Sequence, residues 1–92
     1  MDPVAVYAKL YDRAWKAIVV YNDIARNNGS DSTASLIGLN RISEETLTAL
    51  VIEGGDLYEV VIPMEGDIYD VVSSDRLIWK MQGIFQRVFQ TL

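Results

Sequence analysis

The amino-acid sequence predicts an α+β fold in one domain, residues 1–92, with a long N-terminal helix, a three- to four-stranded antiparallel meander and a C-terminal helix. Three observations support this prediction. Apolar residues recur at helical spacing over residues 3–27, and they do so again over residues 75–91. Between these segments, apolar residues alternate on both sides of Gly54-Gly55, which is typical of a β-hairpin.

The first helix is predicted to begin at Pro3, because Asp2 is a good N-cap and proline suits the first helical position. The turn-forming residues 27–32 end it. Its apolar surface covers more than half of its circumference, whereas an ordinary surface helix has an apolar arc of ~100° or somewhat more. We therefore expect this helix to be covered from two sides, by the sheet and by a second helix or another subunit.

Turn residues at 43–45, 54–55 and 65–67 divide the meander into strands. If Gly54-Gly55 forms a two-residue turn, one face of the central hairpin is entirely apolar. The cross-strand pairs on that face are Val51 with Tyr58, Ala49 with Val60, and Leu47 with Ile62. Pro63 ends the third strand because proline cannot donate to a ladder, and residues 68–72 are the candidate fourth strand.

An alternative interpretation makes residues 33–40 and 43–53 helices and moves the hairpin to residues 57–63 with 68–72. Three helices followed by a two-stranded wing resemble a winged helix-turn-helix. The residues that carry this resemblance are Leu36, Ile42, Ser43, Thr46, Leu47, Leu50 and Gly54. The resemblance implies a DNA-binding transcriptional regulator. We favour the meander because the hairpin faces are consistent and its strands are rich in β-branched and aromatic residues.

Both interpretations end on a helix over residues 75–91, with Ser74 as its N-cap. The apolar residues that would form its buried face are Leu77, Ile78, Met81, Ile84, Phe85, Val88 and Leu92. We also expect an aromatic seam between the two long helices, made by Tyr7, Tyr11, Trp15, Tyr21, Trp79, Phe85 and Phe89.

Charge is distributed unevenly along the chain. Residues 42–75 carry nine carboxylates and no Lys or Arg, although the whole chain has a net charge of only −5. Uncompensated carboxylates repel one another, but their field speeds encounter with a positive surface. They also oppose binding to nucleic acid, because phosphate contacts need Lys or Arg. The acidic segment therefore predicts a basic partner and no direct nucleic-acid binding.

Residue types that usually carry chemistry are missing from the sequence. Without His or Cys, it lacks the commonest general base, the usual metal ligands and a thiol nucleophile. It has no phosphate-binding glycine motif and no calcium-binding loop. The carboxylate pairs Glu53/Asp56 and Glu65/Asp67 flank glycine turns, where solvent opposes the pKa shifts that catalysis needs. We therefore expect no enzyme activity and no catalytic, cofactor-binding or metal-binding residues.

These observations favour a non-enzymatic interaction or regulatory protein that presents an acidic surface to a basic partner. The predicted partner-binding residues are Glu53, Asp56, Glu59, Glu65, Asp67 and Asp70. Size and charge also suit a virus-encoded inhibitor of a nucleic-acid-binding protein. The alternatives are a winged-helix transcriptional regulator and a small structural subunit of a larger assembly. No signal peptide or membrane-length apolar run is visible, so a cytoplasmic location, in a cell or a virus-infected host, is expected.

Self-association is expected because half of the residues are hydrophobic and the mean hydropathy is +0.12, which is high for so short a chain. The second face of the central hairpin is more apolar than a solvated face should be. We therefore predict a homodimer whose interface contains Leu50, Ile52, Leu57 and Val61.

Overall fold

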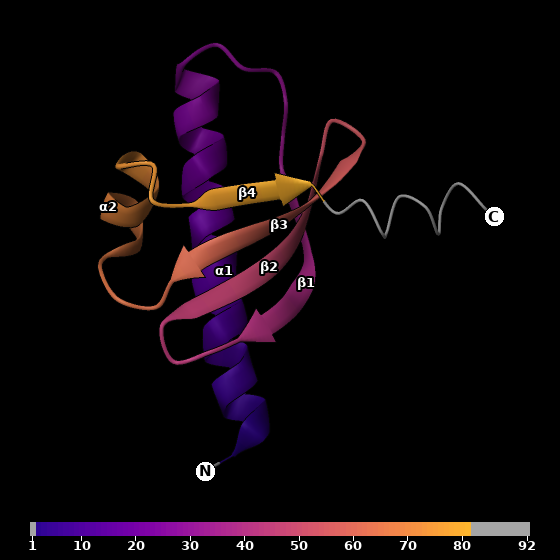
Figure 1. Cartoon of the computed structure of the whole chain (residues 1–92). Coiled ribbons are helices and arrows are strands. Elements are labelled where there is room, and N and C mark those ends of the chain that lie inside the picture. Colours follow the sequence, from indigo (N-terminus) through magenta and orange to yellow (C-terminus); the bar gives the residue numbers. More distant parts are fainter. Residues whose placement is uncertain (1, 82–92) are drawn as a thin grey trace, which may run out of the picture.

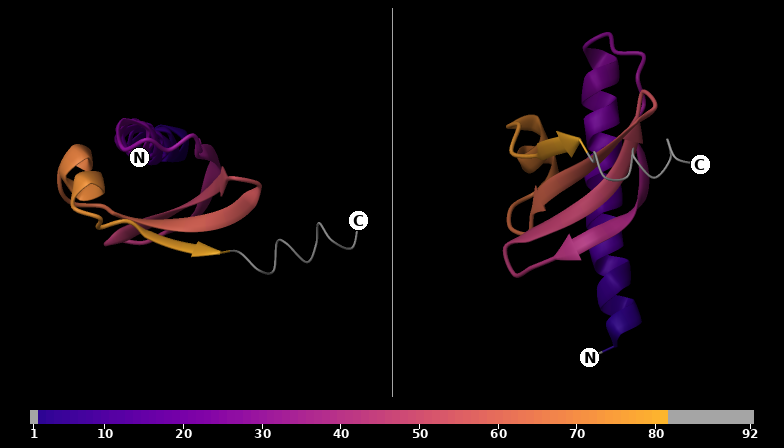
Figure 2. Two further views of the ribbon diagram at one scale, coloured as in Figure 1. Left: turned by 90° about the horizontal axis from the view of Figure 1, so that it is seen from above. Right: turned by 45° about the vertical axis from the view of Figure 1, so that its right-hand side comes forward.

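The computed structural model describes residues 2–81 and confirms an α+β fold with an antiparallel meander. The elements are α1 (Pro3–Asn27), β1 (Ser35–Ile42), β2 (Thr46–Glu53), β3 (Asp56–Pro63), α2 (Ile68–Ser73) and β4 (Ile78–Met81). The strands form one open sheet in the order β1-β2-β3-β4. Helix α1 crosses one face of this sheet and α2 lies beside it on the same side, so no helix within residues 2–81 covers the other face, which we call the open face (Figures 1 and 2).

Helix α1 has the predicted bounds and cap, since the Asp2 carboxylate accepts a hydrogen bond of 3.0 Å from the amide of Val4. Its buried residues are Ala14, Ala17 and Ile18, and two alanines on this face let the helix lie close to the sheet. The expected cover from two sides is partial, because Trp15 remains 52% exposed. Neither α1 nor α2, the helices within residues 2–81, combines the length and apolarity that crossing a membrane requires.

The central hairpin has the predicted register. The pairs Leu47↔Ile62, Ala49↔Val60 and Val51↔Tyr58 lie on the face covered by α1, and five of these six side chains are fully buried. Burial of each large aliphatic side chain contributes roughly 1.5–3 kcal/mol. Gly54 and Gly55 have φ of 62° and 85°, a left-handed pair that matches a tight hairpin turn and that other residues adopt poorly.

The winged helix-turn-helix interpretation is wrong, because residues 35–42 and 46–53 are strands. Strand β1 pairs with β2 through two register shifts, one between Leu36 and Gly38 and one between Leu39 and Arg41. Each shift places an extra residue in β1 and interrupts strict alternation. These irregularities obscure the strand pattern of β1 in the sequence.

Residues 68–72, predicted as a fourth strand, belong to the short helix α2 instead. The Asp67 carboxylate caps this helix by accepting hydrogen bonds from the amides of Tyr69 (2.9 Å) and Asp70 (3.4 Å). The adjacent residues Val71 and Val72 are both buried, which a helical turn beside α1 permits and an alternating strand does not.

The predicted helix over residues 75–91 is wrong for residues 78–81, which form β4; residues 82–91 lie outside the described residues. Strand β4 covers the edge of β3, with Val60 opposite Trp79 and Val61 opposite Ile78. The physical reason is that β3 would otherwise leave its outer backbone groups unpaired. Asp75 has a φ of 56°, which is incompatible with the first turn of a helix.

Candidate functional site: an acidic aromatic cavity

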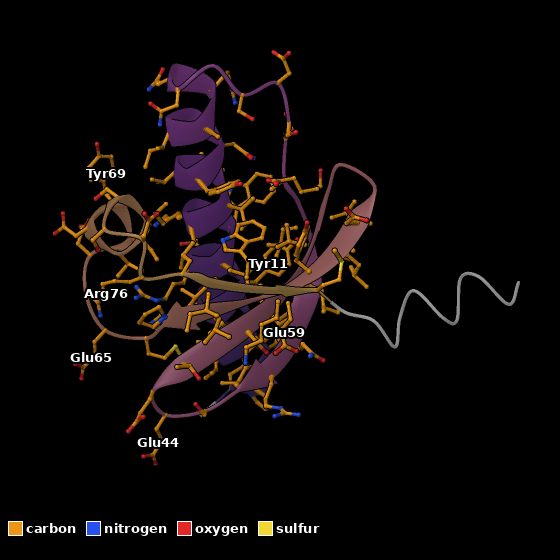
Figure 3. All side chains as sticks on the ribbon, turned by 45° about the horizontal axis from the view of Figure 1, so that its top comes forward. Tyr11, Glu44, Glu59, Glu65, Tyr69 and Arg76 are labelled. Atoms are coloured by element: carbon orange, nitrogen blue, oxygen red, sulfur yellow. The ribbon has the colours of Figure 1, made fainter. Side chains whose placement is uncertain are left out.

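The structure divides the predicted partner-binding carboxylates into two groups at opposite ends of β3. Glu53 and Asp56 flank the Gly54-Gly55 turn, and we call this end of the sheet the hairpin end. Glu65, Asp67 and Asp70 lie at or within α2, and we call that end the α2 end. Glu59 lies between the two groups, on the open face. Glu44 and Glu65 project from the sheet at the α2 end, far from the hairpin turn (Figure 3). Because the eight residues of β3 span about 26 Å, the two groups offer separate surfaces.

Basic residues of α1 gather at the α2 end. The Arg13 guanidinium donates hydrogen bonds to the carbonyl oxygens of Pro63 (3.0 Å from Nε), Gly66 (3.3 Å) and Glu65 (3.3 Å). Lys9 and Lys16 line the same shallow hollow as Arg13, beside Asp67. The carboxylates of the α2 end therefore have positive charge from α1 close by.

A cavity of about 340 Å³ lies at the hairpin end, between α1, the β2–β3 hairpin and the segment that joins α2 to β4. Its lining residues are Tyr21, Glu53, Tyr58, Val72, Asp75, Leu77 and Trp79. The lining thus contains two carboxylates and three aromatic rings, and no Lys or Arg contributes to it within residues 2–81. Such a combination is attractive to a cation and repels an anion.

Trp79 joins the aromatic rings of this cavity. Its ring centroid lies 4.7 Å from that of Tyr21, at an interplanar angle of 40°, and 5.6 Å from that of Tyr58, at 76°. These are favourable tilted and edge-to-face geometries, each worth roughly 0.5–1.5 kcal/mol beyond the area buried. The contact between Tyr21 and Trp79 forms part of the predicted aromatic seam, with Trp79 on β4 rather than on a helix.

Glu53 is held in this cavity by strand alternation. It is the last residue of β2 and lies on the same face as Val51, so its side chain turns toward α1 and is half-buried. Its Oε2 atom is buried and has no hydrogen-bond partner within the described residues. A buried carboxylate oxygen without a partner is costly and marks a place where a donor is missing.

Tyr21 faces Glu53 across the cavity. The pKa of Tyr21 is raised to about 12, chiefly by burial and then by a hydrogen bond with Glu53, the negative charge of Glu53 and an electrostatic interaction with Tyr58. The hydroxyl of Tyr21 therefore stays protonated at physiological pH and donates to the carboxylate.

Sequence reasoning placed Glu53 among the solvated turn carboxylates and did not include Tyr21, Tyr58, Asp75 or Trp79 in the site. The sequence did contain a usable signal, because the alternation that buries Val51 also turns Glu53 toward the core. The positions of Asp75 and Trp79 had no such signal, because both depend on β4 being a strand.

The predicted dimer residues lie on the open face of the sheet. Leu50 and Val61 are half-buried and Ile52 is 41% exposed. The expectation of partial exposure is wrong for Leu57, which is only 5% exposed opposite Ile52. Ile78, directly opposite Val61, adds a side chain that is 54% exposed. The open face therefore carries the apolar side chains of Leu50, Ile52, Val61 and Ile78 beside the charged Glu59 and Lys80, without Leu57 as a contact residue.

Comparisons with protein-family models, with curated proteins and with solved structures each find no match for this chain. Within residues 2–81, no three acidic, His or Cys side chains are grouped closely enough to hold a metal ion. We therefore infer function from the geometry and charge of the cavity.

Proposed function

We propose that this chain is a non-enzymatic interaction protein that regulates a basic partner by binding it at the hairpin end of the sheet. The observation that carries the proposal is the cavity in which Glu53 and Asp75 lie among three aromatic rings. Aromatic residues are enriched at protein interfaces, where they anchor a partner. Carboxylates beside them select a partner of positive charge.

The charge distribution favours the hairpin end over the α2 end. At the α2 end, Lys9, Arg13 and Lys16 lie near the carboxylates and weaken their outward field. The ion pairs Lys16–Asp12 and Arg26–Asp23 both lie within α1, so neither neutralises the hairpin end. A basic partner therefore meets the stronger negative potential near Glu53 and Asp56.

One form of this function is inhibition of a nucleic-acid-binding protein, encoded by a virus and acting in the cytoplasm of an infected host. Such a target has a basic surface that normally contacts phosphates, and an acidic cavity competes for the same side chains. In this form, duplex DNA and the chain compete for one target. The chain itself does not bind free DNA.

The proposal can be tested with a lysine oligomer as a defined basic probe. We expect the wild-type chain to bind it with an affinity that falls as salt increases, because screening acts over ~8 Å at physiological ionic strength. Asp56→Lys should weaken binding through slower association, while the matched reversal Glu44→Lys at the α2 end should change it little. Equal effects of the two reversals would contradict a site at the hairpin end.

The same assay identifies the natural partner when it is repeated as a pull-down from native lysate. Proteins retained by the wild-type chain but lost with Asp56→Lys are the candidates. The proposal requires these proteins to carry basic surfaces and to elute at moderate salt. Retention that is indifferent to salt would instead place the interface on the apolar open face.

A second candidate function is that of a self-associating structural subunit, favoured by the exposed apolar side chains. Ile52 and Ile78 are exposed on the open face, and Trp15 and Val19 line an apolar groove with Tyr69 between α1 and α2. We propose that two copies associate through the open face, so that light scattering gives twice the chain mass. Ile52→Glu should restore the monomer mass, whereas Val19→Glu on α1 should leave the dimer intact. A well-folded wild-type monomer at high concentration would contradict this association.

A further inference from the structure

We propose that the cavity at the hairpin end binds an ammonium group that carries at least one N–H, supplied by a lysine side chain of the partner. This inference deepens the proposed function and rests on it for the source of the lysine. It names the chemical group that the acidic surface selects. Three properties of the cavity support this inference: its rings, a carboxylate oxygen without a partner among residues 2–81, and its size.

The aromatic rings supply the first property. Tyr21 and Tyr58 flank Trp79, with centroid distances of 4.7 and 5.6 Å, and all three line one cavity. A cation within about 6 Å of such rings is attracted by their negative faces, and tryptophan is the strongest of the aromatic partners. Aromatic side chains of these types line sites that recognise alkylated ammonium groups.

The carboxylate of Glu53 supplies the second property. Its Oε2 atom is buried without a hydrogen-bond partner within residues 2–81, and Tyr21 lines the same cavity. A bound ammonium N–H supplies the missing donor and an opposite charge together. A guanidinium ion favours two parallel bonds to both oxygens of a carboxylate, whereas the single unpartnered oxygen Oε2 needs one donor.

Size supplies the third property. A volume of about 340 Å³ lies at the lower end of the range of roughly 300–1,000 Å³ found for small-molecule pockets. This space suits one flexible alkyl chain with a charged end better than a nucleotide or another large ligand. Leu77 and Val72 add apolar lining for the methylene groups, and the exposed Asp75 carboxylate attracts the cation at the rim.

The test uses the full chain, with isotope-labelled indole resonances of Trp79 and Trp15 followed by NMR. The probes are lysine capped at both ends as an amide, its dimethyl and trimethyl forms, capped arginine, capped glutamine and butylamine. We expect capped lysine and its dimethyl form to shift the Trp79 indole saturably and to leave Trp15 unmoved. The trimethyl form should bind about tenfold more weakly, because it cannot donate to Oε2. Capped glutamine should not bind.

Matched variants identify the group responsible. Glu53→Gln should weaken capped-lysine binding at least tenfold, while Glu65→Gln at the α2 end should leave it unchanged. Asp75→Asn provides a second cavity variant that tolerates the positive φ of this position, and it should weaken binding by a smaller factor. If Glu53→Gln does not fold, the ranking of the probes on the wild-type chain still decides the question.

Several outcomes would overturn the inference. They are an unmoved Trp79 indole, equal binding to wild-type and folded Glu53→Gln chains, or a trimethyl form that binds more tightly than capped lysine. Butylamine binding as tightly as capped lysine would overturn the assignment to a protein side chain. Failure of the lysine site can be distinguished from failure of the proposed function. A salt-sensitive partner that is lost with Asp56→Lys would support the proposed function even if capped lysine does not bind. Binding of capped lysine without such a partner would support the lysine site alone.

Discussion

The two ends of the sheet carry the same kind of acidic side chain in opposite environments. At the α2 end, Glu65 is exposed, and Arg13 ties the nearby backbone to α1 through three carbonyl oxygens. At the hairpin end, Glu53 turns into a cavity with aromatic walls, and its Oε2 atom has no hydrogen-bond partner among residues 2–81. The comparison shows that an acidic residue contributes to binding according to what the fold places beside it, not according to how many lie nearby in sequence.

The largest expected effect concerns the α2 end, where Arg13 acts as a structural cation. Arg13→Met keeps much of the apolar stem but removes the donors to the carbonyls of Pro63, Glu65 and Gly66. Bonds from a charged donor are worth roughly 1.5–3 kcal/mol, so we expect a loss of about 3 kcal/mol in the free energy of unfolding. Urea denaturation measures it.

Arg26→Met is the matched control for Arg13→Met. Arg26 makes an exposed ion pair with Asp23 at 3.7 Å within the same helix. Exposed ion pairs contribute about 0–1 kcal/mol, so this change should be nearly neutral. Similar losses in the two variants would show that Arg13 does not hold the α2 end together.

At the hairpin end, the neutral side chain of Asn22 holds a neighbouring segment to α1, as Arg13 does at the α2 end. The amide group of Asn22 donates to the carbonyl of Ala34 and accepts from its N–H, both at 2.9 Å, and so fixes the entry into β1. Asn22→Ala leaves both groups of the buried Ala34 without this partner, and we expect a loss of about 2 kcal/mol in urea denaturation. Asn27→Ala, on an exposed turn of α1, should lower the free energy of unfolding much less. Equal losses in the two variants would show that the bonds from Asn22 to Ala34 do not stabilise the entry into β1.

Much of the scaffold could be predicted from the sequence because it depends on local signals. Asp2 and Pro3 start α1, and Gly54-Gly55 with alternating apolar neighbours fixes the register of β2 and β3. The segment after Pro63 could not be predicted in this way. Its apolar residues match helical spacing, but the unpaired edge of β3 is satisfied by β4, which is a tertiary effect.

The candidate site was predictable only in part for the same reason. The sequence identified the acidic segment and the aromatic residues, but it did not predict that they line one cavity. Glu53 and Tyr58 come from the predicted hairpin, whereas Trp79 and Asp75 reach the cavity because β4 pairs with β3. A cavity built from five separate elements, α1, β2, β3, α2 and β4, leaves no single spacing in the sequence.

A smaller loss of stability is expected at Gly66, whose carbonyl accepts a hydrogen bond from Arg13 and which precedes the capping residue of α2. Its φ of 98° is left-handed, and an added Cβ would lie 3.3 Å from Cγ2 of Val71 and 3.4 Å from Nη1 of Arg76. Gly66→Ala should therefore cost about 1 kcal/mol in thermal or urea denaturation. Gly38→Ala, with an ordinary φ and open space around its Cα, should be neutral or slightly stabilising, and a larger loss there would contradict this account.

The last effect is the most specific to the hairpin end, and it concerns the titration of Tyr21. Because the pKa of Tyr21 is raised to about 12 from an ordinary value near 10, the native state holds this proton more tightly than the unfolded chain does. The resulting stability is fully present below pH 10 and is lost as the pH rises from about 10 to about 12.

Glu53→Gln removes the charge of Glu53 and weakens its hydrogen bond but keeps the burial, so the pKa of Tyr21 should fall while staying above 10. Ultraviolet titration of the phenolate measures this shift, and comparison with Tyr21→Phe identifies which part of the absorbance change belongs to Tyr21. Asp75→Asn is the control, since Asp75 lines the cavity but is not among the causes of the shift. An unchanged titration in Glu53→Gln would mean that the carboxylate does not face the phenol, and the contrast between the two ends of the sheet would then lose its physical basis.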